Sequence, residues 1–321
     1  MKNTTANFSD DVHFTLTIKN LKGAENLVLK DTMDNGFNLK KIFNKFYPQI
    51  MLMSASDATN GVTDHSGVID FNENVHYTCT IPDDGNKESF TIKFTPKGYE
   101  EIAKHPDYVL RISYTATVNN KAKLNNTNTA ELKYADNQKT EDKAYVGTLN
   151  IPVYKYTSKL GVNTALPGAE FTLYKNEDCT QALRFSKVAK TSTYNYSGKE
   201  TDTATLTSDS NGNIAINGLA EGTYYLRETK APDGYNLLRD KIEVTIKPVV
   251  NGATQAIDNQ TLNVLENGEL HEYDKVSVLN NAGSILPSTG GMGTTLIYLV
   301  GGALVLGSGF VLANKKRAKS K

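Results

Sequence analysis

The feature that most restricts the fold of this chain is a regular alternation of apolar and polar residues. In the first 146 residues, three runs have an apolar side chain at every second position: Val12, Phe14, Leu16 and Ile18; Leu110, Ile112, Tyr114, Ala116 and Val118; Ala130, Leu132 and Tyr134. Successive strand side chains point to opposite faces, so this pattern predicts sheets with one buried face. A short helix is expected at 97–105, between two prolines. Residues 1–146 are therefore predicted to form an Ig-like β-sandwich.

A second block of strands is expected at residues 147–282, separated by turns that contain glycine. The strands are predicted at 151–156, 170–174, 223–228, 242–246 and 275–280. The polar, tyrosine-rich stretch 191–205 is interpreted as a long loop between strands. The chain is thus predicted to be all-β, with two Ig-like β-sandwich domains in tandem.

Three strands of the second block carry a polar residue at a position where the alternation demands an apolar one. These residues are Lys155, Glu228 and Asn280. If each strand buries that face, the three side chains point into one core, and an unpaired charge there would be costly. We therefore expect the three to contact one another. Asn281 is the neighbouring alternative, and strand phase selects Asn280.

Two chemical interpretations of this trio remain open. In the first, Lys155 and Glu228 form a buried ion pair, and Asn280 satisfies their remaining hydrogen bonds. In the second, the trio reacts. Burial favours the neutral amine of a lysine and the protonated form of a carboxyl group. Lys155 would attack the side-chain carbonyl of Asn280 with loss of ammonia, Glu228 would move the proton, and an intramolecular isopeptide bond would result.

The end of the chain combines a short motif, an apolar stretch and a basic cluster. Residues 283–291 form a linker that contains the sequence Leu286-Pro287-Ser288-Thr289-Gly290. The following segment, 292–313, has no charged residue, and about 20 helical residues at roughly 1.5 Å each cross a bilayer core. It is predicted to be a transmembrane helix. The basic tail 314–321 is expected on the cytoplasmic side, which places the rest of the chain outside the cell.

This C-terminal arrangement resembles the cell-wall sorting signal of Gram-positive surface proteins. The resemblance implies that a sortase cleaves after Thr289, and that it transfers the acyl group of Thr289 to an amine. The protein would then be a transient single-pass membrane precursor that ends on the cell surface, covalently attached to the cell wall. Sortase is accordingly an expected partner.

Two runs of the second block resemble the repeat-B domain of Gram-positive collagen adhesins and pilins. They are Leu166-Pro167-Gly168-Ala169-Glu170-Phe171-Thr172-Leu173-Tyr174 and Tyr224-Tyr225-Leu226-Arg227-Glu228-Thr229-Lys230-Ala231-Pro232-Asp233-Gly234-Tyr235. The second run is similar to the pilin E box. The resemblance implies that Lys155, Glu228 and Asn280 are the lysine, the acid and the asparagine of a self-generated isopeptide bond.

The first block resembles the middle domain of the same pilins, less specifically. By that pattern, Asp31 and Asn128 would be the acid and the asparagine of a second bond, because each lies in phase with apolar neighbours. The lysine of this second bond should lie on a strand before Val12, and Lys2 is the lysine that the sequence has there. An exposed Lys2 with no role is the competing interpretation.

Composition argues against several classes of function. The residues before Gly290 hold 30 basic and 35 acidic side chains, so nucleic-acid binding is not expected. The five histidines show no metal-ligand spacing, and Cys79 and Cys179 lie too far apart in sequence to suggest a metal site. We expect no metal, no cofactor and no enzyme activity other than the intramolecular bond formation.

The leading hypothesis is a structural subunit of a covalently polymerised pilus, with other pilin subunits or peptidoglycan as partners. Backbone pilins usually carry a Tyr-Pro-Lys motif, whereas Tyr47-Pro48-Gln49 lacks the amine. The alternative is a monomeric, minor or tip adhesin that is anchored to the wall and binds a host extracellular-matrix ligand or glycan. The polar start, 1–10, has no apolar core of a signal peptide, so either the chain is a C-terminal fragment or the gene start is misassigned. We favour a fragment, from which an N-terminal domain would also be missing.

Overall fold

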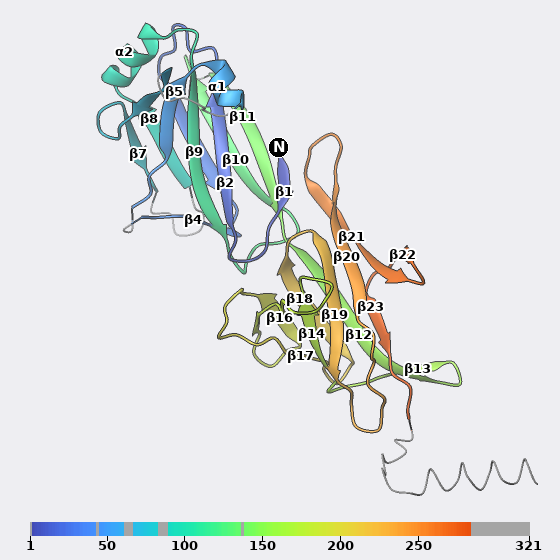
Figure 1. The fold of residues 1–321 in the computed structure, drawn as a ribbon. Helices are drawn as coiled ribbons and strands as arrows, with labels where there is room; N and C mark the ends of the chain where they lie inside the picture. The colour runs from blue at the N-terminus through green and yellow to red at the C-terminus, as the bar shows by residue number, and fades with distance from the viewer. Residues whose placement is uncertain (1, 43–44, 61–66, 83–88, 136–137, 284–321) are drawn as a thin grey trace, which may run out of the picture. The chain divides into compact units, whose positions relative to one another are not determined.

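The computed structural model describes residues 2–42, 45–60, 67–82, 89–135 and 138–283 of this chain (Figure 1). The predicted sorting motif, transmembrane helix and basic tail lie outside the described residues. Among the described residues, no helix is both long and apolar enough to cross a membrane. By its contacts the chain divides into two units, 1–232 with 237–280, and 233–236 with 281–321.

The first sandwich consists of two sheets. One sheet has the order β1-β11-β10-β3-β8-β7, and the other has the order β2-β9-β5-β6, with β4 also paired to β9. The strands are β1 Asn3–Thr5, β2 Asp11–Ile18, β3 Val28–Met33, β4 Phe37–Leu39, β5 Gln49–Met53, β6 Ile69–Phe71, β7 Tyr77–Thr80, β8 Ser89–Phe94, β9 Val109–Val118, β10 Asn126–Tyr134 and β11 Gln138–Gly147. Two short helices, α1 Ala55–Asn60 and α2 Pro96–Lys104, connect strands.

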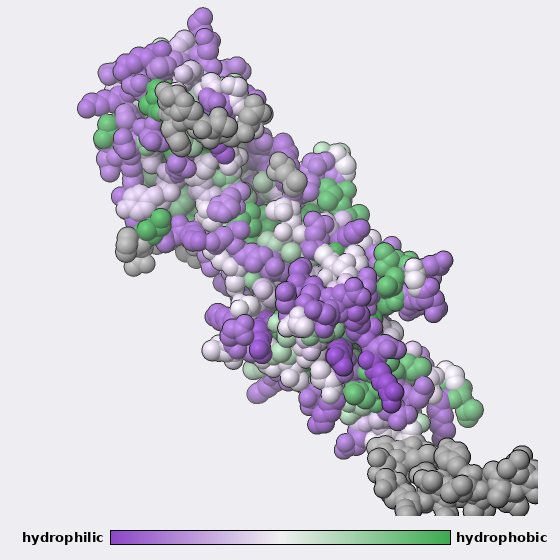
Figure 2. Space-filling model, in the orientation of Figure 1, coloured by the Kyte–Doolittle hydropathy of each residue, from purple (hydrophilic) through white to green (hydrophobic). Residues whose placement is uncertain are grey.

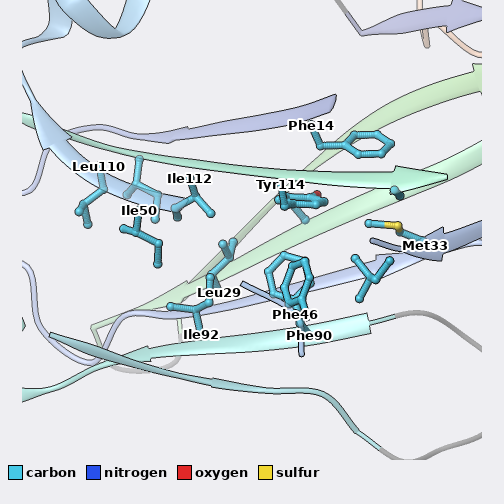
Figure 3. Close-up of a cluster of buried hydrophobic side chains, with 14 of the residues drawn as sticks. Phe14, Leu29, Met33, Phe46, Ile50, Phe90, Ile92, Leu110, Ile112 and Tyr114 are labelled. Atoms are coloured by element: carbon cyan, nitrogen blue, oxygen red, sulfur yellow. The ribbon is translucent and has the colours of Figure 1, made fainter. Parts of the chain in front are cut away.

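The inward faces of these two sheets enclose one hydrophobic core, part of which is drawn in Figure 3. The alternation of β9 decides which residues enter it: Leu110, Ile112 and Tyr114 are buried, and the residues between them are partly exposed. Phe14 stacks on Tyr114, with 5.4 Å between the ring centroids. The predicted period-two pattern is confirmed for β2 and β9, whereas in β10 it ends at Ala130, and Tyr134 is exposed because it lies at the end of the strand.

The second sandwich also consists of two sheets. One has the order β13-β12-β18-β16-β15, with β23 paired to β12, and the other has the order β17-β14-β19-β20-β21-β22. The strands are β12 Leu149–Lys159, β13 Val162–Ala165, β14 Glu170–Tyr174, β15 Phe185–Lys187, β16 Thr193–Tyr196, β17 Leu206–Thr207, β18 Asn213–Leu219, β19 Gly222–Lys230, β20 Ile242–Val250, β21 Ile257–Glu266, β22 Glu269–Glu272 and β23 Val276–Leu279. A separate hydrophobic core lies between these sheets.

The first and last strands of the second sandwich are neighbours. β12 and β23 run parallel, and their register pairs Val153 with Val276 and Lys155 with Val278 (Figure 1). Parallel strands cannot be joined by a tight turn. Here the connection from β12 to β23 consists of all the other strands of the domain. β19 belongs to the opposite sheet and faces this strand pair across the core.

Two local expectations can be compared directly with the structure. The helix predicted at 97–105 is α2, which begins one residue earlier at Pro96, and the side chain of Thr95 accepts a hydrogen bond from the Gly98 amide at its N-terminus. The stretch 191–205 is not a continuous loop, because Thr193–Tyr196 forms β16 and pairs in parallel with β18. Tyr194 holds this segment against the domain. Its ring is buried, and its hydroxyl accepts a hydrogen bond from the Thr207 amide.

The visible face of the molecule is mainly hydrophilic, with apolar residues in small separate groups (Figure 2). The most exposed large apolar side chains of the described residues are Leu160 and Val162, at 96% and 67%. They belong to the turn between β12 and β13 and to the start of β13. Isolated apolar residues of this kind are normal on a surface that faces water.

Candidate functional site

Three strands bring the predicted trio together inside the second sandwich. Lys155 lies on β12, Glu228 on β19, and Asn280 directly follows β23. The Asn280 amide donates a hydrogen bond to the Tyr156 carbonyl, at 2.9 Å, which continues the parallel ladder by one residue. Each of the three side chains is at most 2% exposed, so the contact is closed to bulk water.

The polar atoms of the trio contact one another, and Nζ of Lys155 also donates to the Val278 carbonyl at 3.3 Å. The Nζ atom of Lys155 donates to Oδ1 of Asn280 and lies 3.3 Å from Oε1 of Glu228. Nδ2 of Asn280 donates to Oε1 and Oε2 of Glu228, at 3.0 and 3.2 Å. The amine therefore touches the side-chain amide that it would attack, and one carboxylate lies within reach of both nitrogens.

The surroundings of Lys155 favour its neutral form. Burial lowers the pKa of the Lys155 amine, and the nearby negative charge of Glu228 opposes that effect. The Phe171 ring lies beside the amine, with its centroid 5.9 Å from Nζ. A neutral amine has a free electron pair and can act as a nucleophile, which a protonated ammonium cannot.

Asn280 and Asn281 have different environments, although they are adjacent in sequence. Asn280 is buried and contacts both other members of the trio, whereas Asn281 is exposed. The phase of β23 causes this difference, because Val276 and Val278 point into the same core as Asn280. The structure thus places Asn280, and not its neighbour, in contact with Lys155 and Glu228.

A related cluster lies in the first sandwich, around Asp31 and Asn128. The Tyr114 hydroxyl donates to Oδ2 of Asp31 at 2.6 Å, and Nδ2 of Asn128 donates to the same hydroxyl at 2.6 Å. Nδ2 of Asn128 also lies 3.4 Å from Oδ2 of Asp31. Among the described residues, Oδ1 of Asp31 and Oδ1 of Asn128 have no hydrogen-bond partner.

Burial also governs the ionisation of this first cluster. Asp31 is fully buried, and burial raises its pKa to about 7, against the opposing effect of hydrogen bonds from Tyr114 and Asn128. Between its ordinary pKa of 3.8 and about 7, the Asp31 carboxyl is thus mainly protonated where an ordinary aspartate would be ionised.

The structure does not bring Lys2 to this cluster. The Lys2 side chain is 57% exposed, and its Nζ pairs with Oδ1 of Asp142 at 2.6 Å. Asp31 and Asn128 are buried and contact Tyr114 instead. The cluster therefore offers an acid and an amide without an amine.

Two groups in these sites were not identified from the sequence. Tyr114 was assigned only to the buried face of its strand, although a buried tyrosine hydroxyl regularly requires a hydrogen-bond partner. The other is the backbone amide of Leu238, which donates to Oε2 of Glu228 at 2.7 Å. Leu238 lies in the irregular segment between β19 and β20, where no periodic pattern could indicate its contact.

Two regions of the chain match known families. Residues 150–261 match the family of SpaA prealbumin-like fold domains, and residues 280–321 match the LPXTG cell wall anchor motif. The chain is a cell-wall-anchored surface protein, and its residues 150–261 are similar to the SpaA domain. The anchor motif includes the predicted sorting signal, so the expectation of a cell-surface, wall-attached protein is confirmed. No curated protein matches the chain.

The fold of this wall-anchored chain is that of Gram-positive backbone pilins. It is similar to the pilus 2b backbone protein of group B streptococcus, with 23% identity and a TM-score of 0.59, over 89% of this chain and 98% of the other. It is also similar to the 35 kDa C-terminal fragment of the major pilin GBS80 of Streptococcus agalactiae, with 23% identity and a TM-score of 0.57, over 87% and 96%. The RrgB pilus backbone of Streptococcus pneumoniae gives 15% identity and a TM-score of 0.58, over 87% and 94%. The predicted all-β pilin fold is confirmed.

Proposed function

We propose that this protein is a structural subunit of a covalently polymerised pilus, joined or anchored by sortase at Thr289. The observation that carries the proposal is the buried contact of Lys155, Glu228 and Asn280 between the first and last strands of a wall-anchored domain. A shaft subunit transmits tension along its chain, and this contact lies where tension enters and leaves the domain. The pilin fold supports the same role.

The trio would form an isopeptide bond between Lys155 and Asn280. The neutral amine attacks Cγ of Asn280, a bond forms between Nζ and Cγ, and the bond between Cγ and Nδ2 breaks. Glu228 takes a proton from Nζ and returns it to Nδ2, which leaves as ammonia. The charges and atoms balance without a metal, a cofactor or an external reactant.

This bond would change how the domain carries force. The linked residues are 125 positions apart, so tension would pass from β12 to the chain after Asn280 without crossing the strands between them. The hydrogen bonds of the β12 and β23 ladder would then carry little of the load. A pilus subunit of this kind resists extension through covalent bonds.

The first sandwich provides part of a second reaction site. Asp31 and Asn128 have the burial and the mutual contact that an acid and a reacting asparagine need. The ion pair of Lys2 with Asp142 does not support Lys2 as the nucleophile. A second bond would therefore require an amine at Oδ1 of Asn128.

The second candidate function is that of a monomeric, minor or tip adhesin that binds a host extracellular-matrix ligand or glycan. It is favoured by Tyr47-Pro48-Gln49, which has glutamine at the position where a pilin motif carries its acceptor lysine. Purified chain incubated with sortase separates the two functions. A ladder of multimers supports the shaft, whereas transfer to a small amine without multimers supports the adhesin.

The intact mass of the purified chain tests the bond itself. The parent should be lighter than its calculated mass by about 17 Da, the mass of one ammonia, because Lys155 has displaced Nδ2 of Asn280. Lys155→Ala should have its full calculated mass. Lys159→Ala is the matched control, because Lys159 lies on the same strand but is exposed, and it should keep the deficit. A folded parent with its full mass would reduce the trio to a buried ion pair.

A further inference from the structure

The carboxylate of Glu228 is held by a group that takes no part in the exchange of atoms. Among the described residues, the donors to Glu228 are Lys155, Asn280 and the backbone amide of Leu238. The first two are the reacting partners, and their positions change as the bond forms. The Leu238 amide is therefore the one fixed donor to this carboxylate.

The two oxygens of Glu228 have different neighbours. Oε2 accepts from the Leu238 amide at 2.7 Å and from Nδ2 of Asn280 at 3.2 Å. Oε1 lies 3.0 Å from the same Nδ2 and 3.3 Å from Nζ of Lys155. A proton that leaves Lys155 and arrives on the departing nitrogen needs one oxygen within reach of both. The ion-pair contact of Nζ with Glu228 is made to Oε1, at 3.3 Å.

We propose that the Leu238 amide is the positioning group of the bond-forming reaction, and that it fixes Oε1 of Glu228 as the atom that relays the proton. By engaging Oε2, the N–H prevents rotation of the carboxylate and leaves Oε1 free to accept the proton. An N–H that points at a charged oxygen also stabilises the carboxylate that must act as the base. This inference rests on the proposed isopeptide bond.

The local structure explains why the Leu238 amide is available. Leu238 lies in the segment that connects β19 with β20, and this segment has no regular hydrogen-bond ladder at 236–239. The Leu238 side chain packs against the core of the second sandwich. The packed side chain anchors the segment, and the backbone N–H is left to point at the buried carboxylate, which satisfies both polar groups.

The test compares two substitutions of similar size at this position. Leu238→Pro removes the N–H, and Leu238→Ala keeps it while also shortening the side chain. The full chain is synthesised by cell-free translation, synthesis is stopped, and the fraction lighter by about 17 Da is followed with time. We expect Leu238→Pro to form the bond about tenfold more slowly or worse, because it lacks a hydrogen bond to a charged group, and Leu238→Ala to react at nearly the parent rate. Leu237→Pro controls for a proline in this segment.

Equal rates for Leu238→Pro and the parent would overturn the positioning role, and so would an equal slowing by Leu238→Ala. A parent without any mass deficit would instead overturn the isopeptide bond itself. Amide hydrogen exchange covers the case in which Leu238→Pro does not fold. The Leu238 amide should be protected in Lys155→Ala, which keeps the carboxylate, and should exchange at least about tenfold faster in Glu228→Ala. Equal protection in these two variants would also overturn the proposal.

Discussion

At the scale of single residues, burial decides the chemistry of both clusters. Lys155 in the second sandwich has a lowered amine pKa because it is buried, and Asp31 in the first has a raised carboxyl pKa for the same reason. The difference between the two sites lies in the third partner. Asn280 presents Oδ1 to an amine, whereas Oδ1 of Asn128 has no partner among the described residues. A complete trio can react, and an incomplete one remains a buried polar cluster.

Substitution of the two adjacent asparagines distinguishes their roles. Asn280→Ala should abolish the mass deficit of about 17 Da, because no side-chain carbonyl is left for Lys155 to attack. Asn281→Ala should keep the deficit, since Asn281 is exposed and makes no contact with Lys155. Mass spectrometry of the crosslinked peptide checks both. A deficit that survives in Asn280→Ala would place the reaction at another residue.

The raised pKa of Asp31 predicts a pH dependence of stability. The carboxyl is protonated in the folded protein up to about pH 7 but ionises near 3.8 when unfolded. Its contribution is therefore complete below the unfolded pKa and is lost as the pH rises toward 7, by at most about 1.4 kcal/mol per pH unit. Thermal unfolding at several pH values between 4 and 8 should show this loss in the parent and not in Asp31→Asn. The same pH dependence in both proteins would contradict it.

At the scale of elements, the parallel pairing of β12 with β23 places Lys155 and Asn280 together. Strand phase alone predicted that Lys155, Glu228 and Asn280 share one core, since a period of two decides which side chains face inward. The Leu238 contact could not be predicted in this way, because an irregular segment has no period. β16 was missed for a related reason, since its four residues are too few and too polar for a clear pattern.

The bond should stabilise the second sandwich by restricting the unfolded chain. By analogy with a disulfide, closing a loop of 125 residues contributes roughly 5 kcal/mol. Calorimetry should therefore find Lys155→Ala lower in Tm by roughly 10 °C or more, while Lys159→Ala stays close to the parent. Equal Tm values for the parent and Lys155→Ala would argue against a crosslink in the parent.

The turn that contains Gly212 sets the position of β12 at the site. The Gly212 carbonyl accepts from the Lys155 amide at 2.7 Å, and a Cβ on Gly212 would lie 2.2 Å from the Lys155 carbonyl oxygen. Gly212→Ala should displace Lys155 and slow bond formation at least about tenfold, since small misplacements of reacting atoms are costly. Gly161→Ala is the control, because Gly161 has a similar positive φ and open space around it. The time course of the mass deficit compares them, and equal rates would show that β12 tolerates the change.

At the scale of the whole molecule, the sequence predicted the general plan of two sandwiches and an anchor more completely than the details of the sites. The plan depends on long patterns, such as alternation over many strands and the matched anchor motif at 280–321. The cluster around Asp31 depends on which side chains meet across a core, and the hydroxyl of Tyr114 could not be placed there by periodicity. Contacts between distant residues need the fold before they can be named.

Anchoring to the wall should depend on the sorting motif. Thr289→Ala should move the protein from the cell-wall fraction to the membrane fraction and the medium, because the altered motif lacks the threonine that the sortase recognises next to the cleaved bond. Ser288→Ala should remain in the wall fraction, since it stands at the variable position of the motif. Immunoblots of fractionated cells check both variants. Wall attachment of Thr289→Ala would contradict cleavage at this threonine.

The contact of Lys155 with Asn280 bears on how the domain would withstand cleavage of its backbone. Once these residues are bonded, the 124 residues between them form a closed covalent ring with the bond itself. A single backbone cut anywhere in that ring, for instance at the exposed turn near Leu160, would leave one continuous covalent path from β12 to the anchor. A surface filament built from such subunits would survive a nick in this domain that would sever an ordinary chain.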